Sequence, residues 1–99
     1  SKYAEISRTL AGLEAQGRVD KLEEYINKAD PNELALAPAY VEMSKEVAAM
    51  RKMIELIAIQ PESGFSPADK RKQIEQTTLD MISMVREFNG AVKEAKKKK

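Results

Sequence analysis

Residues 38–60 (PAYVEMSKEVAAMRKMIELIAIQ) and 66–89 (SPADKRKQIEQTTLDMISMVREFN) decide the fold of this 99-residue chain. Apolar residues recur there in alternating steps of three and four, which places them on one stripe of a helix. The pattern predicts two long helices that pair along these stripes, as in a coiled coil. The paired stripes, called the seam, are Leu36, Tyr40, Met43, Val47, Met50, Ile54 and Ile57, and Ile74, Thr78, Met81, Val85, Phe88 and Val92.

The seam residues also predict an antiparallel register. Counted outward from the loop, the pairs are Ile57–Ile74, Ile54–Thr78, Met50–Met81, Val47–Val85, Met43–Phe88 and Tyr40–Val92. The two residue numbers of every pair add up to 131 or 132, so one fold point near Phe65 and Ser66 serves all of them. Such agreement is typical of a specified structure. Thr78, the polar seam residue, is expected to bond back to its own helix or to fix the register.

Local signals predict where the two long helices begin and end. Pro38 suits the first position of a helix, and Pro61 ends that helix near residue 60. In Ser66-Pro67-Ala68-Asp69, the serine caps the second helix and the aspartate returns a carboxylate to the cap. Gly90 is expected either to follow the end of this helix or to interrupt it mildly.

Shorter helices are predicted before the hairpin. Apolar spacing indicates a helix over residues 2–15, which Gly17 ends in the left-handed conformation, and a second helix over residues 18–29. Asp30-Pro31 is a good helix start, but we expect it to open only about one turn, because the residue before Pro38 is disfavoured in a helix.

These elements predict an all-α fold, namely a long antiparallel helical hairpin (about 38–60 and 66–89, extending over 38–92) packed with one or two shorter N-terminal helices. About half of the residues are Ala, Glu, Lys, Leu or Arg, a composition typical of long helices. We expect one helical domain over residues 1–95, followed by a basic tail, residues 96–99.

Apolar residues beside the seam form the expected protein interface. They widen the apolar band beyond what a two-helix hairpin can cover, so a third partner is needed. The N-terminal helices, with residues such as Leu22 and Ile26, supply this partner, or a neighbouring subunit does. The expected interface residues are Met53, Leu56, Ile59, Leu79 and Ile82.

The residue types of the chain argue against catalysis and metal binding. The chain has no Cys and no His, so thiolate sites, the commonest zinc ligand and the usual general base are missing. The carboxylates lie on the polar sides of amphipathic helices, where solvated charges belong. We therefore expect no enzymatic activity, no cofactor and no metal site. No apolar run approaches the roughly 20 residues that span a bilayer.

Basic charge gathers at the C-terminal end. Residues 1–65 hold 8 basic and 11 acidic side chains, whereas residues 66–99 hold 9 basic and 5 acidic ones. Lys96, Lys97, Lys98 and Lys99 account for most of this excess. They are candidates for weak, salt-dependent contact with nucleic acid or another anion; a merely solvated end of the chain is the simpler interpretation.

Residues 51–89 contain a sequence pattern that is known from other proteins. It combines Arg51-Lys52 in mid-helix, a proline-containing loop, Phe65-Ser66-Pro67-Ala68-Asp69-Lys70-Arg71, and a helix closing on Arg86-Glu87-Phe88-Asn89. It resembles the helix–SPxxKR–helix hairpin near the ends of very large bacteriophage polyvalent and internal virion (ejection) proteins. The resemblance covers the last half of the chain well and the first half loosely. It implies an accessory, structural role in a phage particle and carries over no catalytic residue.

Two functions follow as expectations. The first is a non-enzymatic assembly module of a phage particle or ejection apparatus, which self-associates or joins a larger parent or virion assembly. The chain would then be a fragment or a small free-standing relative, located in the virion or the bacterial host cytoplasm. The alternative is a small helical regulator or adaptor that binds nucleic acid or a partner helix with help from the lysine tail.

Overall fold

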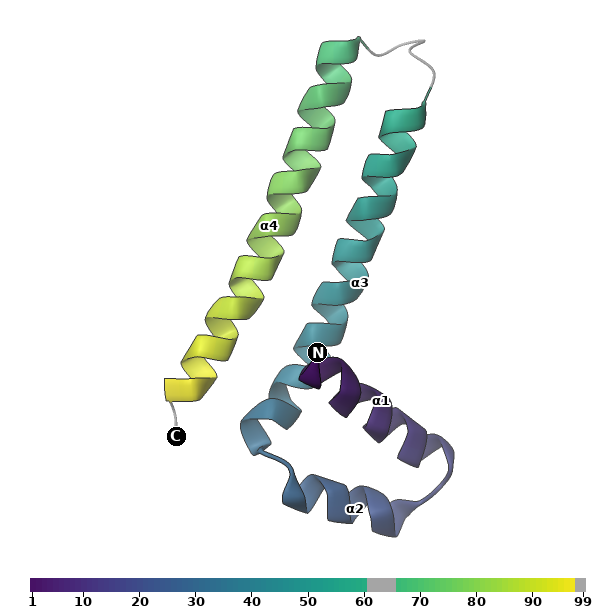
Figure 1. Ribbon diagram of the computed structural model, residues 1–99, viewed down its shortest axis with the longest axis vertical. Coiled ribbons are helices and arrows are strands. Elements are labelled where there is room, and N and C mark those ends of the chain that lie inside the picture. The colour runs from purple at the N-terminus through teal and green to yellow at the C-terminus, as the bar shows by residue number, and fades with distance from the viewer. Residues whose placement is uncertain (61–65, 98–99) are drawn as a thin grey trace. The chain divides into compact units, whose positions relative to one another are not determined.

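The computed structural model describes residues 1–60 and 66–97 and builds them almost entirely from helices. The helices are α1 (Lys2–Ala15), α2 (Val19–Lys28), α3 (Pro31–Ile59) and α4 (Pro67–Lys97) (Figure 1). The described residues contain no strand. The all-α prediction is confirmed. The chain divides into two compact units: unit 1 is Ser1–Glu42 with Gly90–Lys99, and unit 2 is Met43–Asn89.

Unit 1 contains α1, α2, the start of α3 and the end of α4. Tyr3, Ile6 and Ala37 are its buried residues, and the rings of Tyr3 and Tyr40 lie 5.9 Å apart between centroids. The α1–α2 connection follows the predicted glycine ending. Gly17 has a φ of 66°, and the amide of Arg18 donates to the Leu13 carbonyl at 3.1 Å. This six-residue bond is the Schellman ending of a helix.

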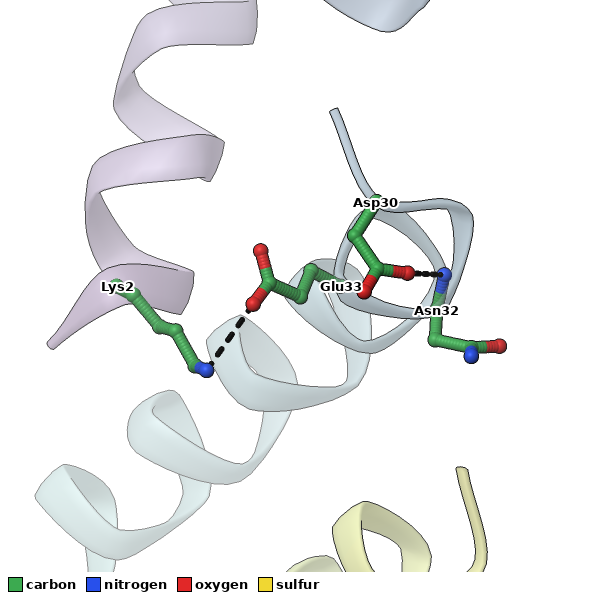
Figure 2. Close-up of polar contacts among 4 residues, drawn as sticks. All are labelled: Lys2, Asp30, Asn32 and Glu33. Atoms are coloured by element: carbon green, nitrogen blue, oxygen red, sulfur yellow. Dashed lines mark hydrogen bonds and ion pairs between the residues drawn. The ribbon is translucent and has the colours of Figure 1, made fainter. Parts of the chain in front are cut away.

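Polar contacts fasten the start of α3 within unit 1 (Figure 2). The Asp30 carboxylate accepts from the Asn32 amide at 2.9 Å, so Asp30 caps α3 as predicted. Lys2 Nζ donates to Glu33 Oε1 at 3.0 Å, which joins α1 to the first turn of α3. The Asn32 side-chain amide donates to the Ala95 carbonyl at 3.3 Å, which joins this turn to α4.

The first long helix begins earlier than predicted. It starts at Pro31 and continues through Pro38, whereas the sequence placed its start near Pro38 and allowed only one turn before it. Packing overrides the local preference here, because the residues around the proline are held in unit 1. Ala37 is 1% exposed, and Tyr40 stacks against Tyr3. Pro38 itself is exposed, and its missing N–H leaves the Leu34 carbonyl without a helical donor.

The second long helix ends later than predicted. It continues through Gly90 to Lys97, so Gly90 neither ends it nor takes a positive φ. Residues beyond the glycine contribute to unit 1: Val92 and Ala95 are half-buried, and the Ala95 carbonyl accepts from Asn32. These contacts outweigh the roughly 1 kcal/mol that a glycine costs inside a helix.

Unit 2 is the hairpin, in which the C-terminal part of α3 and the N-terminal part of α4 run antiparallel (Figure 1). Ser66 and Asp69 cap α4 reciprocally, as predicted: the Asp69 amide donates to Ser66 Oγ at 3.2 Å, and the Ser66 amide donates to Asp69 Oδ2 at 3.4 Å. Lys70 Nζ donates to the Gln60 carbonyl, which ties the first turn of α4 to the end of α3. Of the predicted fold point, Phe65 lies outside the described residues.

Burial follows the predicted seam. Every seam residue of α3 is half-buried, as are those of α4 except Val85, which is just exposed. Val47 and Val85, a predicted pair, line one groove together with Met81. The Thr78 hydroxyl donates to the Ile74 carbonyl at 2.7 Å, so this threonine bonds back to its own helix.

Candidate interaction surface

Unit 2 has no fully buried side chain within its described residues, 43–60 and 66–89. Two helices can cover only one side of each other, so the seam is half-buried and the flanks stay open to solvent. The hydrophobic residues exposed in unit 2 range from Val85, 39% exposed, to Ile59, 77% exposed. Among the described residues of unit 2, the exposed large hydrophobic ones are Met53, Leu56, Ile59, Leu79, Ile82 and Val85. It includes all five residues that the sequence assigned to an interface.

These residues occupy two faces rather than one band. Ile82 lines the groove that contains Arg51, and Arg51 and Met53 are two positions apart in α3. Two positions turn a helix by about 200°, so the two residues flank the seam on opposite sides. The face of Met53, Leu56 and Ile59, spaced by three, is called the α3 stripe. Leu79, one turn before Ile82, belongs to the groove side of α4.

The groove is built by both arms of the hairpin. Its volume is about 340 Å³. Val47 and Arg51 come from α3, and the other lining residues come from α4: Met81, Ile82, Val85 and Arg86. Apolar side chains thus form most of the lining, with one arginine from each helix. Neither arginine has an ion-pair partner within the part of the chain that the structure describes.

A second exposed apolar surface lies in unit 1, on α2. Val19 is 70% exposed and Ile26 is 45% exposed, while Leu22 and Tyr25 are half-buried. The sequence analysis names Ile26 only among the residues with which the N-terminal helices could cover the hairpin. Val19 and Ile26 are seven residues apart, with Glu23 between them, so all three lie on one face of α2. This spacing is the sequence signal that points to the α2 surface.

The predicted lysine tail is partly helical. Lys96 and Lys97 form the last turn of α4, and Lys97 Nζ lies 3.5 Å from Glu94 Oε1. Cations are favoured at the negative end of the helix dipole, which explains why the helix extends into the lysines. Lys98 and Lys99 lie outside the described residues.

Four polar residues of unit 1 gather around the start of α3. Lys2, Asp30, Asn32 and Glu33 line a cleft of about 50 Å³. Their contacts are those of Figure 2, and the Glu33 carboxylate, by hydrogen bonding and by its charge, raises the pKa of Lys2 above its usual 10.5. Among residues 1–60 and 66–97, no cluster of three or more acidic side chains is placed to hold a metal ion.

Comparisons with protein-family models, with curated proteins and with solved structures find no match. Across the described helices, none is long and apolar enough to cross a membrane. The exposed apolar surfaces are therefore the features from which function can be inferred.

Proposed function

We propose that this chain is a non-enzymatic helical assembly module that acts through helix–helix packing with other protein. One observation carries the proposal. The described part of unit 2 buries no side chain fully, yet it exposes large hydrophobic residues on both flanks of its seam. Contiguous exposed apolar residues of this kind mark protein interaction sites on soluble domains.

The energetics favour a partner that covers both faces. Burying a whole Leu, Ile or Met side chain contributes about 1.5–3 kcal/mol, and these side chains are already partly covered, so each has roughly 1–2 kcal/mol left to contribute. One face alone would yield a few kcal/mol, whereas association costs an estimated 4–15 kcal/mol or more. Stable docking thus needs the α3 stripe and the groove together, or one face supplemented by contacts elsewhere.

The resemblance of residues 51–89 to phage hairpins supplies the setting for this proposal. The setting is a phage particle or its ejection apparatus, with the virion or the bacterial host cytoplasm as the location. The capped start of α4 at Ser66, which lies within the resembling stretch, is a helix-stabilising feature in this structure. It supports a structural role for the motif.

The proposal is tested by measuring the molar mass of the full chain by light scattering during size exclusion. We expect a mass above that of the 11.1 kDa monomer, both at about 0.1 M and at about 1 M salt, because apolar contacts are not screened. Met53→Glu and Ile82→Glu should each lower it. Ser83→Glu is the matched control, because Ser83 is exposed on α4 and belongs to neither face.

The lysine-tail alternative makes the opposite salt prediction. A chain that contacts nucleic acid through Lys96–Lys99 should lose affinity for a DNA duplex steeply as salt rises, and deleting these lysines should abolish binding. Monomeric mass at every concentration, combined with salt-sensitive DNA binding, would overturn the assembly proposal.

A further inference from the structure

We propose that the groove of unit 2 receives helix α2 of a second copy of this chain. Val19 and Ile26 of that α2 would lie on the apolar lining of the groove, and Glu23 would lie between Arg51 and Arg86. This inference rests on the proposed assembly function and names the partner.

Helix α2 has the composition that the groove requires. Val19, Glu23 and Ile26 follow one another by four and three residues, so they share one face of the helix. The two apolar residues are exposed, and Glu23 has no ion-pair partner among the described residues. The neighbouring Glu24 differs, because it pairs with Lys21 at 3.7 Å and Lys28 at 3.0 Å. The outward face of α2 is thus an apolar pair with an uncompensated carboxylate between its members.

The groove has the complementary composition. Val47, Met81, Ile82 and Val85 are its apolar lining, and Arg51 and Arg86 bring two positive charges without acidic partners in the described residues. A carboxylate held between two guanidinium groups forms charge-assisted hydrogen bonds, and arginine binds carboxylates in fixed geometry. A partner helix with acidic and apolar residues on one face therefore fits this groove better than a basic or purely apolar one.

The groove is shorter than the span of the apolar pair on α2, so Val19 and Ile26 would lie toward its two ends, with Glu23 between them. Val19 and Ile26 are separated by about 10 Å along the helix axis, at 1.5 Å per residue. The groove extends from Val47 to Arg51 on α3 and from Met81 to Arg86 on α4, which is somewhat more than one turn of each helix. A short exposed helix such as α2, Val19–Lys28, can lie across it, as in other helix-in-groove complexes.

Because each copy carries both surfaces, the contact is between different patches of identical chains. Two copies can exchange α2 reciprocally and close a dimer, or each copy can bind the next and build an open array. Both arrangements use the same contact, so both follow from the same proposal.

Charge reversal tests the contact in the full chain. In Glu23→Arg, α2 presents a cation to Arg51 and Arg86; in the double variant R51E/R86E, the groove presents acids to Glu23. Each variant alone should associate at least about tenfold more weakly, because like charges are brought together. In an equimolar mixture, α2 of each variant meets a groove of opposite charge on the other, so association should return.

The matched control is Glu24→Arg, since Glu24 bonds within its own helix and does not share the face of Val19 and Ile26. It should leave association unchanged, and Glu23→Gln should weaken it less than Glu23→Arg does. Circular dichroism of each variant checks that the helices remain. The proposal is overturned if the mixture associates no better than its components, or if Glu23→Arg associates as the unaltered chain does. If Glu23→Arg associates as the unaltered chain does, the assembly function still stands. If the unaltered chain is monomeric throughout, the assembly function and the docking of α2 are both overturned.

Discussion

Arg51 of α3 and Arg86 of α4 line the same groove of unit 2, although they belong to different arms of the hairpin. Neither arginine has an ion-pair partner among the described residues, and an anion placed between them would offset the repulsion between the two like charges. The groove therefore suits an acidic amphipathic helix better than a basic one. This relationship is what distinguishes the groove from the α3 stripe.

Replacing Gly90 by Ala should stabilise the chain. Gly90 lies inside α4, and nothing stands within 4 Å of an added Cβ. Alanine should raise the free energy of unfolding by about 1 kcal/mol through its higher helix propensity. Urea unfolding followed by circular dichroism measures this change. Gly17→Ala is the control of opposite sign, because Gly17 has a φ of 66°; equal effects at the two sites would contradict the helical assignment of Gly90.

Replacing Pro38 by Ala should also stabilise α3. The proline interrupts a helix that runs from Pro31 to Ile59, and alanine restores the N–H that can donate to the Leu34 carbonyl. The gain should be up to about 3 kcal/mol in the free energy of unfolding. Thermal unfolding with and without the substitution measures it. A destabilised variant would instead favour a helix that begins only at Pro38.

Much of the fold could be predicted because its signals are local. Ser66 and Asp69 identify the start of α4 by chemistry alone, and Gly17 identifies the end of α1. Pro38 and Gly90 misled the prediction for one reason: each is a helix breaker by local preference, and each lies in a segment that unit 1 holds through contacts distant in sequence. Burial of Ala37 and the bond from Asn32 to Ala95 cannot be seen from spacing.

Sequence reasoning found some of the exposed apolar residues and missed others. Met53, Leu56, Ile59, Leu79 and Ile82 are all exposed in the structure, and their spacing by three beside the seam is enough to find them. Which of the two faces each residue joins depends on how each helix is rotated about its own axis in the hairpin. The α2 surface was missed because Ile26, taken with Leu22, also fits an inward stripe of an amphipathic helix.

Removing the Ser66 hydroxyl should destabilise the hairpin. Ser66 Oγ accepts from the Asp69 amide at 3.2 Å, so Ser66→Ala leaves that donor without its cap. The free energy of unfolding should fall by about 1 kcal/mol. Ser83→Ala is the control, because Ser83 is exposed and lies in the middle of α4; it should be neutral or slightly stabilising. If both substitutions behave alike in urea unfolding, the cap does not contribute as the geometry indicates.

The ion pair of Lys2 and Glu33 should stabilise unit 1 in a pH-dependent way. Since Glu33 raises the pKa of Lys2 above 10.5, the contribution is complete below the unfolded pKa and is lost as pH rises through the folded pKa. The stability difference between the unaltered chain and Lys2→Met should therefore shrink only above about pH 10.5. Urea unfolding across the alkaline range measures it, with Lys45→Met as a control. A difference that stays constant through the alkaline range would contradict the pair.

Site-specific crosslinking tests the central claim most directly, because the chain has no cysteine of its own. A Val19→Cys chain is mixed with an Ile82→Cys chain under mild oxidation, and the disulfide-linked heterodimer is quantified by non-reducing mass spectrometry, which separates it from the two homodimers by mass. We expect it to form well above the level obtained when Lys93→Cys replaces Ile82→Cys, since only Ile82 lines the groove. Equal yields from Ile82→Cys and Lys93→Cys would contradict docking of α2 in the groove of a second copy.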